Sequence, residues 1–139
     1  MGDAEAGGRQ DPSTPPASSS IEGKLLDCCR DRLAANVLVV GHHGSMTSSR
    51  TAFLDAGGPS IFVVSSMKYG SVVLPDQLVI DELASRGQLF RTDFDDASCA
   101  QNPAKIGPDG DGEAGGCDNV RVTVAADGQV TADYWRGSD

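Results

Sequence analysis

The sequence predicts an α/β fold in which one mixed β-sheet is combined with helices and ends in an antiparallel hairpin. Three observations predict it. Short apolar runs alternate with stretches of helical pattern between residues 19 and 91. The runs 36–40 and 61–64 are apolar at consecutive positions, as expected of strands covered on both faces. Apolar and polar residues alternate on either side of a turn in 120–134, which predicts a hairpin with one face in water.

The first helix is expected to begin at a capping box, Ser19-Ser20-Ile21-Glu22, in which Glu22 follows the capping residue by three positions. Apolar residues then recur every four positions, which predicts a single buried stripe. The stripe consists of Ile21, Leu25, Cys29 and Leu33. A strand over 36–40 follows this helix.

Two further helices are expected between the strands. The first covers 50–56 and is ended by Gly57-Gly58. Pro75 opens the second, which stops at Gly87. Its core-facing residues are Val79, Ile80 and Leu83. A short strand over 89–91 comes next, and the closing hairpin turns at Asp127-Gly128.

Residues 1–20 begin with a Gly-Asp motif, Gly2-Asp3. The rest of this segment is rich in Gly, Ser and Pro, which predicts a disordered linker. The remaining stretch, 21–139, is long enough for one modest core. A content of 39% hydrophobic and 5% aromatic residues suits an aliphatic α/β core. No run approaches the roughly 20 apolar residues of a membrane span, and the N-terminus lacks the pattern of a signal peptide. We therefore expect a soluble protein, cytoplasmic by default, with no membrane partner.

The net charge of −9 is concentrated near the C-terminal end. Between Asp93 and Asp118, acidic residues face a single base, Lys105. Binding to a phosphate backbone requires clustered Lys and Arg, so we expect no direct nucleic-acid binding. A solvated loop is the simplest interpretation of this stretch. A loose calcium site is the alternative, although the spacing of an EF-hand is absent.

The four cysteines form two sets. Cys28 and Cys29 are adjacent within the first predicted helix, where neighbouring residues do not normally pair. Cys99 and Cys117 bracket a Gly- and Asp-rich loop, and in an oxidising compartment they could form a disulfide. A zinc ribbon is not expected, because no Cys-x-x-Cys spacing occurs.

His42 and His43 are the only histidines, and they directly follow the strand at 36–40. Ligands in layered α/β folds gather at the carboxyl ends of strands. Imidazole is a common zinc ligand, and a turn at a strand end can hold it rigidly. The pair therefore indicates a metal site, whereas simple hydrogen bonding within a turn is the alternative.

The run V-L-V-V-G-H-H-G-S-M-T-S-S, residues 37–49, is similar to the V-L-K-V-G-H-H-G-S-x-T-S-S segment of the ComEC-type, competence-protein-like branch of the metallo-β-lactamase superfamily. The resemblance continues in order along nearly the whole chain. Its further matches are Phe53-Leu54, the strand 61–65, Leu74-Pro75-Asp76 through Leu83, Arg91-Thr92-Asp93 and Gly115 to Val120. Upstream, Gly2-Asp3-Ala4-Glu5 resembles the family's G-D-x-E motif.

The resemblance implies the C-terminal half of an αβ/βα sandwich, here 21–139, and a hydrolase that uses zinc or other divalent ions to activate water against a phosphodiester or similar ester bond. It implies that Asp3 is a metal-bridging carboxylate and that one of His42 and His43 is a terminal ligand. Spacing alone does not decide which histidine binds.

The family's main metal motif, H-x-H-x-D-H, is not in this chain, because His42 and His43 are its only histidines. Relatives also carry Tyr-Gly-His-Pro before the third helix, where this chain has Tyr69-Gly70-Ser71. We therefore expect negligible activity from the chain alone. Its expected partner is a complementary N-terminal half-domain or a second copy. The alternative is a non-catalytic remnant or interaction domain that retains the fold.

Overall fold

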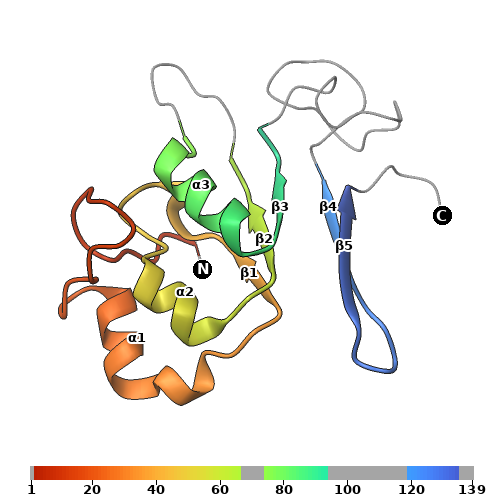
Figure 1. The fold of residues 1–139 in the computed structure, drawn as a ribbon, viewed down its shortest axis with the longest axis horizontal. Helices are drawn as coiled ribbons and strands as arrows, with labels where there is room; N and C mark the ends of the chain where they lie inside the picture. Colours follow the sequence, from red (N-terminus) through yellow and green to blue (C-terminus); the bar gives the residue numbers. More distant parts are fainter. Residues whose placement is uncertain (1, 67–73, 94–118, 135–139) are drawn as a thin grey trace.

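Three parallel strands form the centre of the structure. The computed structural model describes three stretches of the chain: residues 2–66, 74–93 and 119–134. The strands lie side by side in the order β1 (Val37–Val39), β2 (Ile61–Val64) and β3 (Gln88–Arg91) (Figure 1). Helix α2 (Thr51–Gly57) lies between β1 and β2 in the chain, and α3 (Gln77–Arg86) precedes β3. Parallel neighbours require such crossovers, and the predicted alternation of strands and helices is confirmed.

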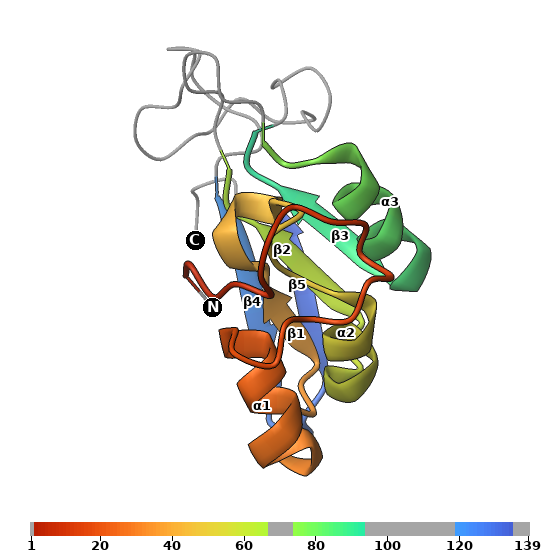
Figure 2. The ribbon, with the colours of Figure 1, turned by 90° about the vertical axis from the view of Figure 1, so that its left-hand side faces the viewer.

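Helices cover one face of this sheet, with α2 lying between α1 (Ile21–Cys29) and α3 (Figures 1 and 2). The hydrophobic core lies between the helices and the sheet and consists of Val40, Leu54, Phe62, Val64, Val79, Ile80 and Leu83. The three α3 residues predicted to face the core are thus confirmed. Within the described stretches, no helix combines the length and the apolar character needed to cross a membrane.

The start of α1 differs from the predicted capping box. Ser20, not Ser19, is the N-cap, and its side-chain oxygen accepts a hydrogen bond from the backbone N–H of Gly23 at 3.1 Å. Glu22 does not turn back toward the cap. Its carboxylate instead accepts hydrogen bonds from the backbone of a segment 27 and 28 residues further along the chain.

The apolar stripe predicted for α1 is only partly buried. Leu25, Cys29 and Leu33 are half-buried, whereas Ile21 is 51% exposed. The fully buried residue of the helix is Glu22, at 1% exposure. The prediction for Ile21 is wrong because α1 packs on the fold through a polar contact rather than through a continuous apolar seam.

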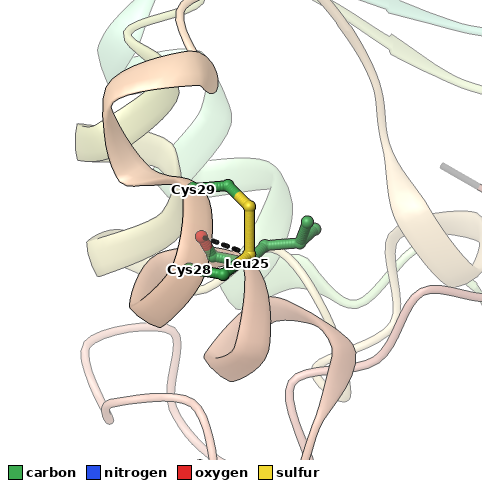
Figure 3. The surroundings of a disulfide bond; sticks show 3 residues. All are labelled: Leu25, Cys28 and Cys29. Carbon is green, nitrogen blue, oxygen red and sulfur yellow. Dashed lines mark hydrogen bonds between the residues drawn. A yellow bond between two sulfur atoms is a disulfide. The ribbon is translucent and has the colours of Figure 1, made fainter.

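Cys28 and Cys29 form a disulfide, contrary to the expectation that adjacent cysteines would not pair (Figure 3). The expectation assumed that both residues lie in regular helix. The backbone leaves helical geometry at Cys29, where φ is −144° and ψ is 18°, and the 3-10 turn η1 (Arg30–Arg32) follows. The proposed pairing of Cys99 with Cys117 lies outside the described residues.

The C-terminal strands β4 (Val120–Val124) and β5 (Val130–Tyr134) form the predicted antiparallel hairpin. They make a separate two-stranded sheet, so the prediction of one mixed sheet is wrong. The Tyr134 hydroxyl connects the hairpin to β3, since it accepts from the N–H of Arg91 at 3.0 Å and donates to its carbonyl at 3.2 Å. A side chain thus occupies backbone groups of β3 that a further strand would need. The Tyr134 ring also meets Phe90 edge-on, with centroids 5.4 Å apart.

The hairpin lies on the side of the parallel sheet away from the helices (Figures 1 and 2). Val39 of β1 is on this side, because its neighbours Leu38 and Val40 pack toward the helices. Val39 is 49% exposed, and Val122 and Val124 of the hairpin are 41% and 68% exposed. This face of the molecule therefore retains uncovered apolar residues.

The N-terminal segment, residues 2–20, crosses the helices and the turn that follows β1 (Figure 2). Ala4 and Ala6 are 6% and 1% exposed, and the N–H of Ala6 donates to the carbonyl of Thr47 at 2.6 Å. The composition predicts a disordered linker here, whereas the structure gives the segment a defined course. Backbone groups make most of these contacts, and residue composition carries little information about them. The division of the chain into 1–20 and 21–139 stays a prediction.

Candidate functional site

The turn that follows β1 carries both histidines in a rare backbone conformation. Within the 3-10 turn η2 (Gly41–Gly44), His42 and His43 have φ of 47° and 54°. A non-glycine residue in this left-handed region costs about 1–2 kcal/mol. Hydrogen bonds maintain the turn, among them one from the hydroxyl of Ser48 to the carbonyl of Gly41 at 2.7 Å. Strained backbone that its surroundings maintain is typical of functional turns.

Gly44 fixes the same turn against the segment before α3. Its φ is 76°, and a Cβ at this position would lie 2.5 Å from the Cβ of Pro75 and 3.3 Å from Cγ1 of Val64. The carbonyl of Gly44 also accepts from the N–H of Asp76 at 2.9 Å. Glycine is therefore the residue that fits here without a displacement of Pro75.

The imidazole of His43 has a defined tautomer. Its Nδ1 lies 2.7 Å from the carbonyl oxygen of Ser65, at the end of β2. A carbonyl only accepts hydrogen bonds, so Nδ1 carries a proton and Nε2 of the neutral ring keeps its lone pair. His43 is exposed. The ring is therefore oriented by the backbone and has one nitrogen able to bind a ligand.

The imidazole of His42 is also held through its Nδ1 atom. Its Nδ1 lies 2.7 Å from Oγ1 of Thr47 and 3.2 Å from Oε1 of Glu5. The Thr47 hydroxyl donates to Oγ of Ser45, and the Glu5 carboxylate can only accept. Both partners therefore favour a proton on Nδ1, which leaves Nε2 free. Imidazoles that bind metals commonly donate the other ring N–H to a carboxylate or a carbonyl in this way.

The segment around Asp3 reaches the histidine turn through its backbone. The carbonyl of Gly2 accepts from the N–H of His42 at 2.8 Å, and the carbonyl of Glu5 accepts from the N–H of Glu22 at 3.1 Å. Asp3 itself is exposed. A pocket of about 310 Å³ lies between this segment and the start of α1 and is lined by Asp3, Glu5, Gly7, Ala17, Ser19, Ser20 and Ile21.

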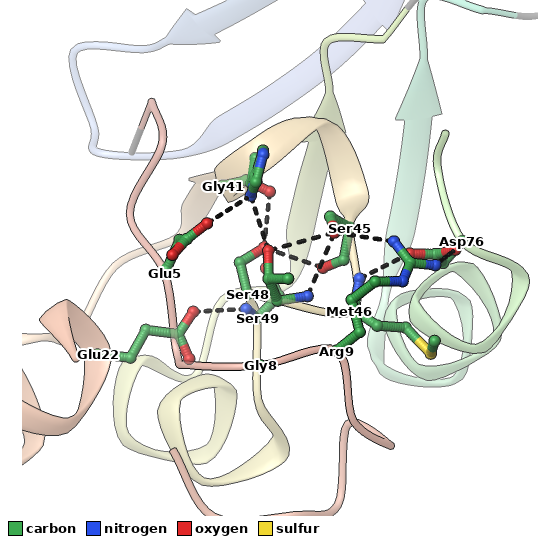
Figure 4. A network of polar contacts seen from close by, with 12 residues as sticks. Glu5, Gly8, Arg9, Glu22, Gly41, Ser45, Met46, Ser48, Ser49 and Asp76 are labelled. Atoms are coloured by element: carbon green, nitrogen blue, oxygen red, sulfur yellow. Dashed lines mark hydrogen bonds and ion pairs between the residues drawn. The ribbon is translucent and has the colours of Figure 1, made fainter. Parts of the chain in front are cut away.

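The polar residues after the histidines connect three segments (Figure 4). Asp76, at the N-cap of α3, accepts from Nη2 of Arg9 at 2.6 Å and from the backbone N–H of Met46 at 2.7 Å. Nη1 of Arg9 also reaches Oγ of Ser45 at 3.4 Å. The N-terminal segment, the turn and α3 are thereby held together around Asp76, whose side chain is only 14% exposed.

Glu22 connects α1 to the start of α2. Its carboxylate accepts from the backbone N–H groups of Ser49 and Arg50, just before the first residue of α2 (Figure 4). Negative charge at a helix N-terminus is favourable. Burial raises the pKa of Glu22, and the hydrogen bonds from Arg50 and Ser49 oppose that shift. Burial also lowers the pKa of Arg50, while the charge of Glu22 raises it.

The structure places the backbone of the segment that contains Asp3 beside the histidine turn. His42 and the Gly2–Glu5 segment are in contact, and His43 lies on the same turn. Within residues 2–66, 74–93 and 119–134, no group of three or more His, Cys, Asp or Glu side chains is placed to hold a metal ion. The stretch at Tyr69 to Ser71 lies outside the described residues.

Sequence reasoning missed the residues that orient the rings: Glu5, Thr47 and Ser65. Glu5 and Thr47 match lettered positions of the G-D-x-E and H-H-G-S-x-T-S-S motifs that the sequence resembles, and that match was the available signal. Ser65 contributes only its backbone carbonyl, which leaves no trace in the sequence.

Comparison with known proteins gives one partial similarity. Over 77 residues, or 55% of this chain, the sequence is 38% identical to the competence protein ComA of Neisseria gonorrhoeae. The matched stretch is 11% of that protein's length. No family model matches the chain, and no solved structure matches it. Part of this chain is thus similar to a short stretch of a competence protein.

Proposed function

We propose that this chain is the C-terminal half of a metallo-β-lactamase-fold, metal-dependent hydrolase of the ComEC-type branch, acting on a phosphodiester or similar ester bond. The H-H-G-S-x-T-S-S motif and the similarity to a competence protein support the relationship. The observation that carries the proposal is the state of the two imidazoles. Each is oriented through Nδ1, by Ser65 in His43 and by Thr47 and Glu5 in His42, and each keeps Nε2 for a ligand.

The chemistry of these donors fits a divalent metal ion, because imidazole nitrogen and carboxylate oxygen are the usual partners of zinc in hydrolases. His42, His43 and Asp3 would supply ligands from this chain. They do not complete a site by themselves, since a catalytic zinc ion takes about three protein ligands. We propose that the missing ligands come from a complementary N-terminal half that carries H-x-H-x-D-H. A metal ion bound there would lower the pKa of a water molecule and so supply hydroxide at neutral pH.

The chain's own residues would orient and support this site. The carbonyl of Ser65 fixes the ring plane of His43, and Glu5 helps to orient the ring of His42 through Nδ1. The packing of Gly44 on Pro75 holds the turn at a constant distance from α3. Such support matters because small displacements of ligands weaken catalysis strongly.

The first prediction concerns hydrolysis of bis(4-nitrophenyl) phosphate in the presence of zinc or manganese. We expect the chain alone to give negligible turnover, because its ligand set is incomplete. Addition of a polypeptide that carries the complementary half should produce turnover, measured by release of nitrophenolate. His42→Ala or His43→Ala should reduce that turnover by about 100-fold or more, as the loss of a metal ligand would.

Asp31→Ala serves as the matched control, because Asp31 is an exposed acid of the turn η1. Its turnover should equal that of the unsubstituted chain. Turnover by the chain alone that disappears in the histidine variants would contradict the proposal that the site is incomplete. A reconstituted enzyme insensitive to both histidine substitutions would exclude the assignment of this turn to the metal site.

An interaction domain without catalysis is the alternative. The exposed valines Val39, Val122 and Val124 favour it, because uncovered apolar side chains often mark a docking face. The coding sequence upstream of this chain discriminates between the two. An in-frame H-x-H-x-D-H within the preceding couple of hundred codons supports the hydrolase, whereas a nearby stop codon with no complementary reading frame supports the interaction domain.

A further inference from the structure

We infer that Arg50 is a positioning residue that holds the N-terminal segment, and with it Asp3 and Glu5, beside the histidine turn. The inference rests on the proposed function for the role of Asp3, but its structural part stands on contacts of Arg50 alone. Arg50 directly follows the Thr47-Ser48-Ser49 end of the H-H-G-S-x-T-S-S motif and is not itself one of the motif residues.

Arg50 is a charged side chain with no solvent exposure. Its Nη1 donates to the carbonyls of Gln10 and Asp11, and its Nη2 donates to the carbonyl of Gly8 at 2.6 Å. One guanidinium thus binds three carbonyl groups within four consecutive residues. Nε of Arg50 is buried and has no hydrogen-bond partner in the described part of the chain.

The planar guanidinium is suited to this task. Its donors diverge from one rigid plane, so they can reach several carbonyls of a curved segment at once. A lysine ammonium has three donors on one atom and cannot span the same carbonyls. The carboxylate of Glu22 binds the backbone N–H of the same Arg50, and its negative charge raises the pKa of Arg50 against the effect of burial. Glu22 therefore partly compensates the buried positive charge.

The bonds from Arg50 extend a series of contacts between two segments that run in the same direction. Gly2 pairs with His42, Ala6 with Thr47, and Pro12 with Thr51, each through one backbone hydrogen bond. Arg50 binds the stretch between Ala6 and Pro12. Without its guanidinium, the stretch around Asp3 and Glu5 would keep its backbone bonds at Gly2, Glu5 and Ala6 and the contact of the Glu5 carboxylate with His42, but the residues that follow it would lose three bonds.

Amide hydrogen exchange measured by NMR on the full chain tests the inference. In Arg50→Lys, exchange at the N–H groups of Ala6 and His42, which both bond across the two segments, should accelerate about tenfold or more. The N–H of Val40, which donates to Val63 inside the sheet, is the internal reference and should not change. Arg50→Gln, which carries no charge, repeats the test if the lysine variant does not fold.

Arg86→Lys is the matched control. Arg86 is a half-buried arginine that joins Asp55 of α2 to Glu82 of α3, and its contacts lie outside the N-terminal segment. Its substitution should leave exchange at Ala6 and His42 relative to Val40 unchanged. Unaltered exchange at both amides in a folded Arg50 variant would overturn the inference, as would an equal effect of Arg86→Lys.

Titration with Co²⁺, followed by visible absorption, then connects the segment to metal binding. We expect weak binding by the full chain, about tenfold weaker binding by Arg50→Lys, and no change in Arg86→Lys. If the unsubstituted chain gives no Co²⁺ signal, as its incomplete ligand set allows, the exchange result alone decides the positioning role. Absence of a signal in the enzyme reconstituted with the complementary half as well would exclude the proposed metal site. If Asp3→Ala weakens Co²⁺ binding and Arg50→Lys does not, the positioning role is overturned.

Discussion

Single residues set the geometry of the histidine turn. His42 and His43 adopt positive φ, and the glycine that follows them continues the left-handed course at φ 76°. The neighbours of this turn are close on every side, with Pro75 and Val64 against Gly44 and the hydroxyl of Ser48 on the carbonyl of Gly41. The turn is therefore specified by steric fit more than by any one strong interaction.

Gly44→Ala should destabilise the fold more than Gly58→Ala. Both glycines have positive φ, of 76° and 56°, so both substitutions incur a backbone cost of about 1–2 kcal/mol. Only at Gly44 does the new methyl meet Pro75, at 2.5 Å, whereas Gly58 has open space. We expect Gly44→Ala to lose roughly 1–3 kcal/mol more of unfolding free energy, as overpacking does. Urea denaturation of both variants measures it, and equal losses would contradict the steric account.

At the scale of elements, α1 is attached to the fold through Glu22. The helix places this carboxylate at the start of α2, where two backbone N–H groups need acceptors. The sequence predicted that α1 exists and begins near Ser20. It could not predict the attachment, because the partner lies 27 residues away and contributes only backbone. A glutamate three residues after a serine gives the same sequence pattern in both cases: when its side chain caps its own helix and when it binds the start of another helix.

The stability of the protein should depend on the protonation of Glu22. Burial raises the pKa of Glu22 above 4.5, so the folded state holds its proton more tightly than the unfolded state. This contribution to stability is complete below pH 4.5 and is lost as pH rises through the raised pKa. Glu22→Gln does not titrate. As pH rises toward neutral, the unfolding free energy of the variant should therefore increase relative to that of the unsubstituted chain. Urea denaturation at several pH values measures this difference.

If the difference in unfolding free energy between Glu22→Gln and the unsubstituted chain stays constant with pH, the raised pKa of Glu22 is contradicted. A difference that moves in the opposite direction would mean that the hydrogen bonds from Ser49 and Arg50 outweigh burial. Either result can be separated from a general loss of the fold, because only the dependence on pH is compared.

At the scale of the whole molecule, the helices cover one face of the sheet and the hairpin covers part of the other. The apolar runs at 36–40 and 61–64, the helices between strands and the alternation in 120–134 were sufficient to predict these elements and their order. The separation of the hairpin from the parallel sheet was not predictable, because local alternation does not reveal that Tyr134 binds the backbone of Arg91. The path of the N-terminal segment was missed for a similar reason, since a distant arginine binds its carbonyls.

The incompletely covered face should promote association. Val39 is 49% exposed there, and Leu78 is 48% exposed on α3, on the opposite side of the sheet. With salt added to screen the net charge of −9, we expect the chain to self-associate. Val39→Lys should weaken that association about tenfold, and Leu78→Lys should leave it unchanged, as measured by sedimentation equilibrium. An equal effect of both substitutions would indicate non-specific association instead.

The bond from His42 to the carbonyl of Gly2 has a practical consequence. Any polypeptide attached upstream of Gly2, such as a purification tag, emerges directly beside the histidine turn. A polyhistidine tag at that end would introduce imidazoles that compete with His42 and His43 for the same ions, and its binding would be mistaken for theirs. A tag that is removed up to Gly2 avoids this interference.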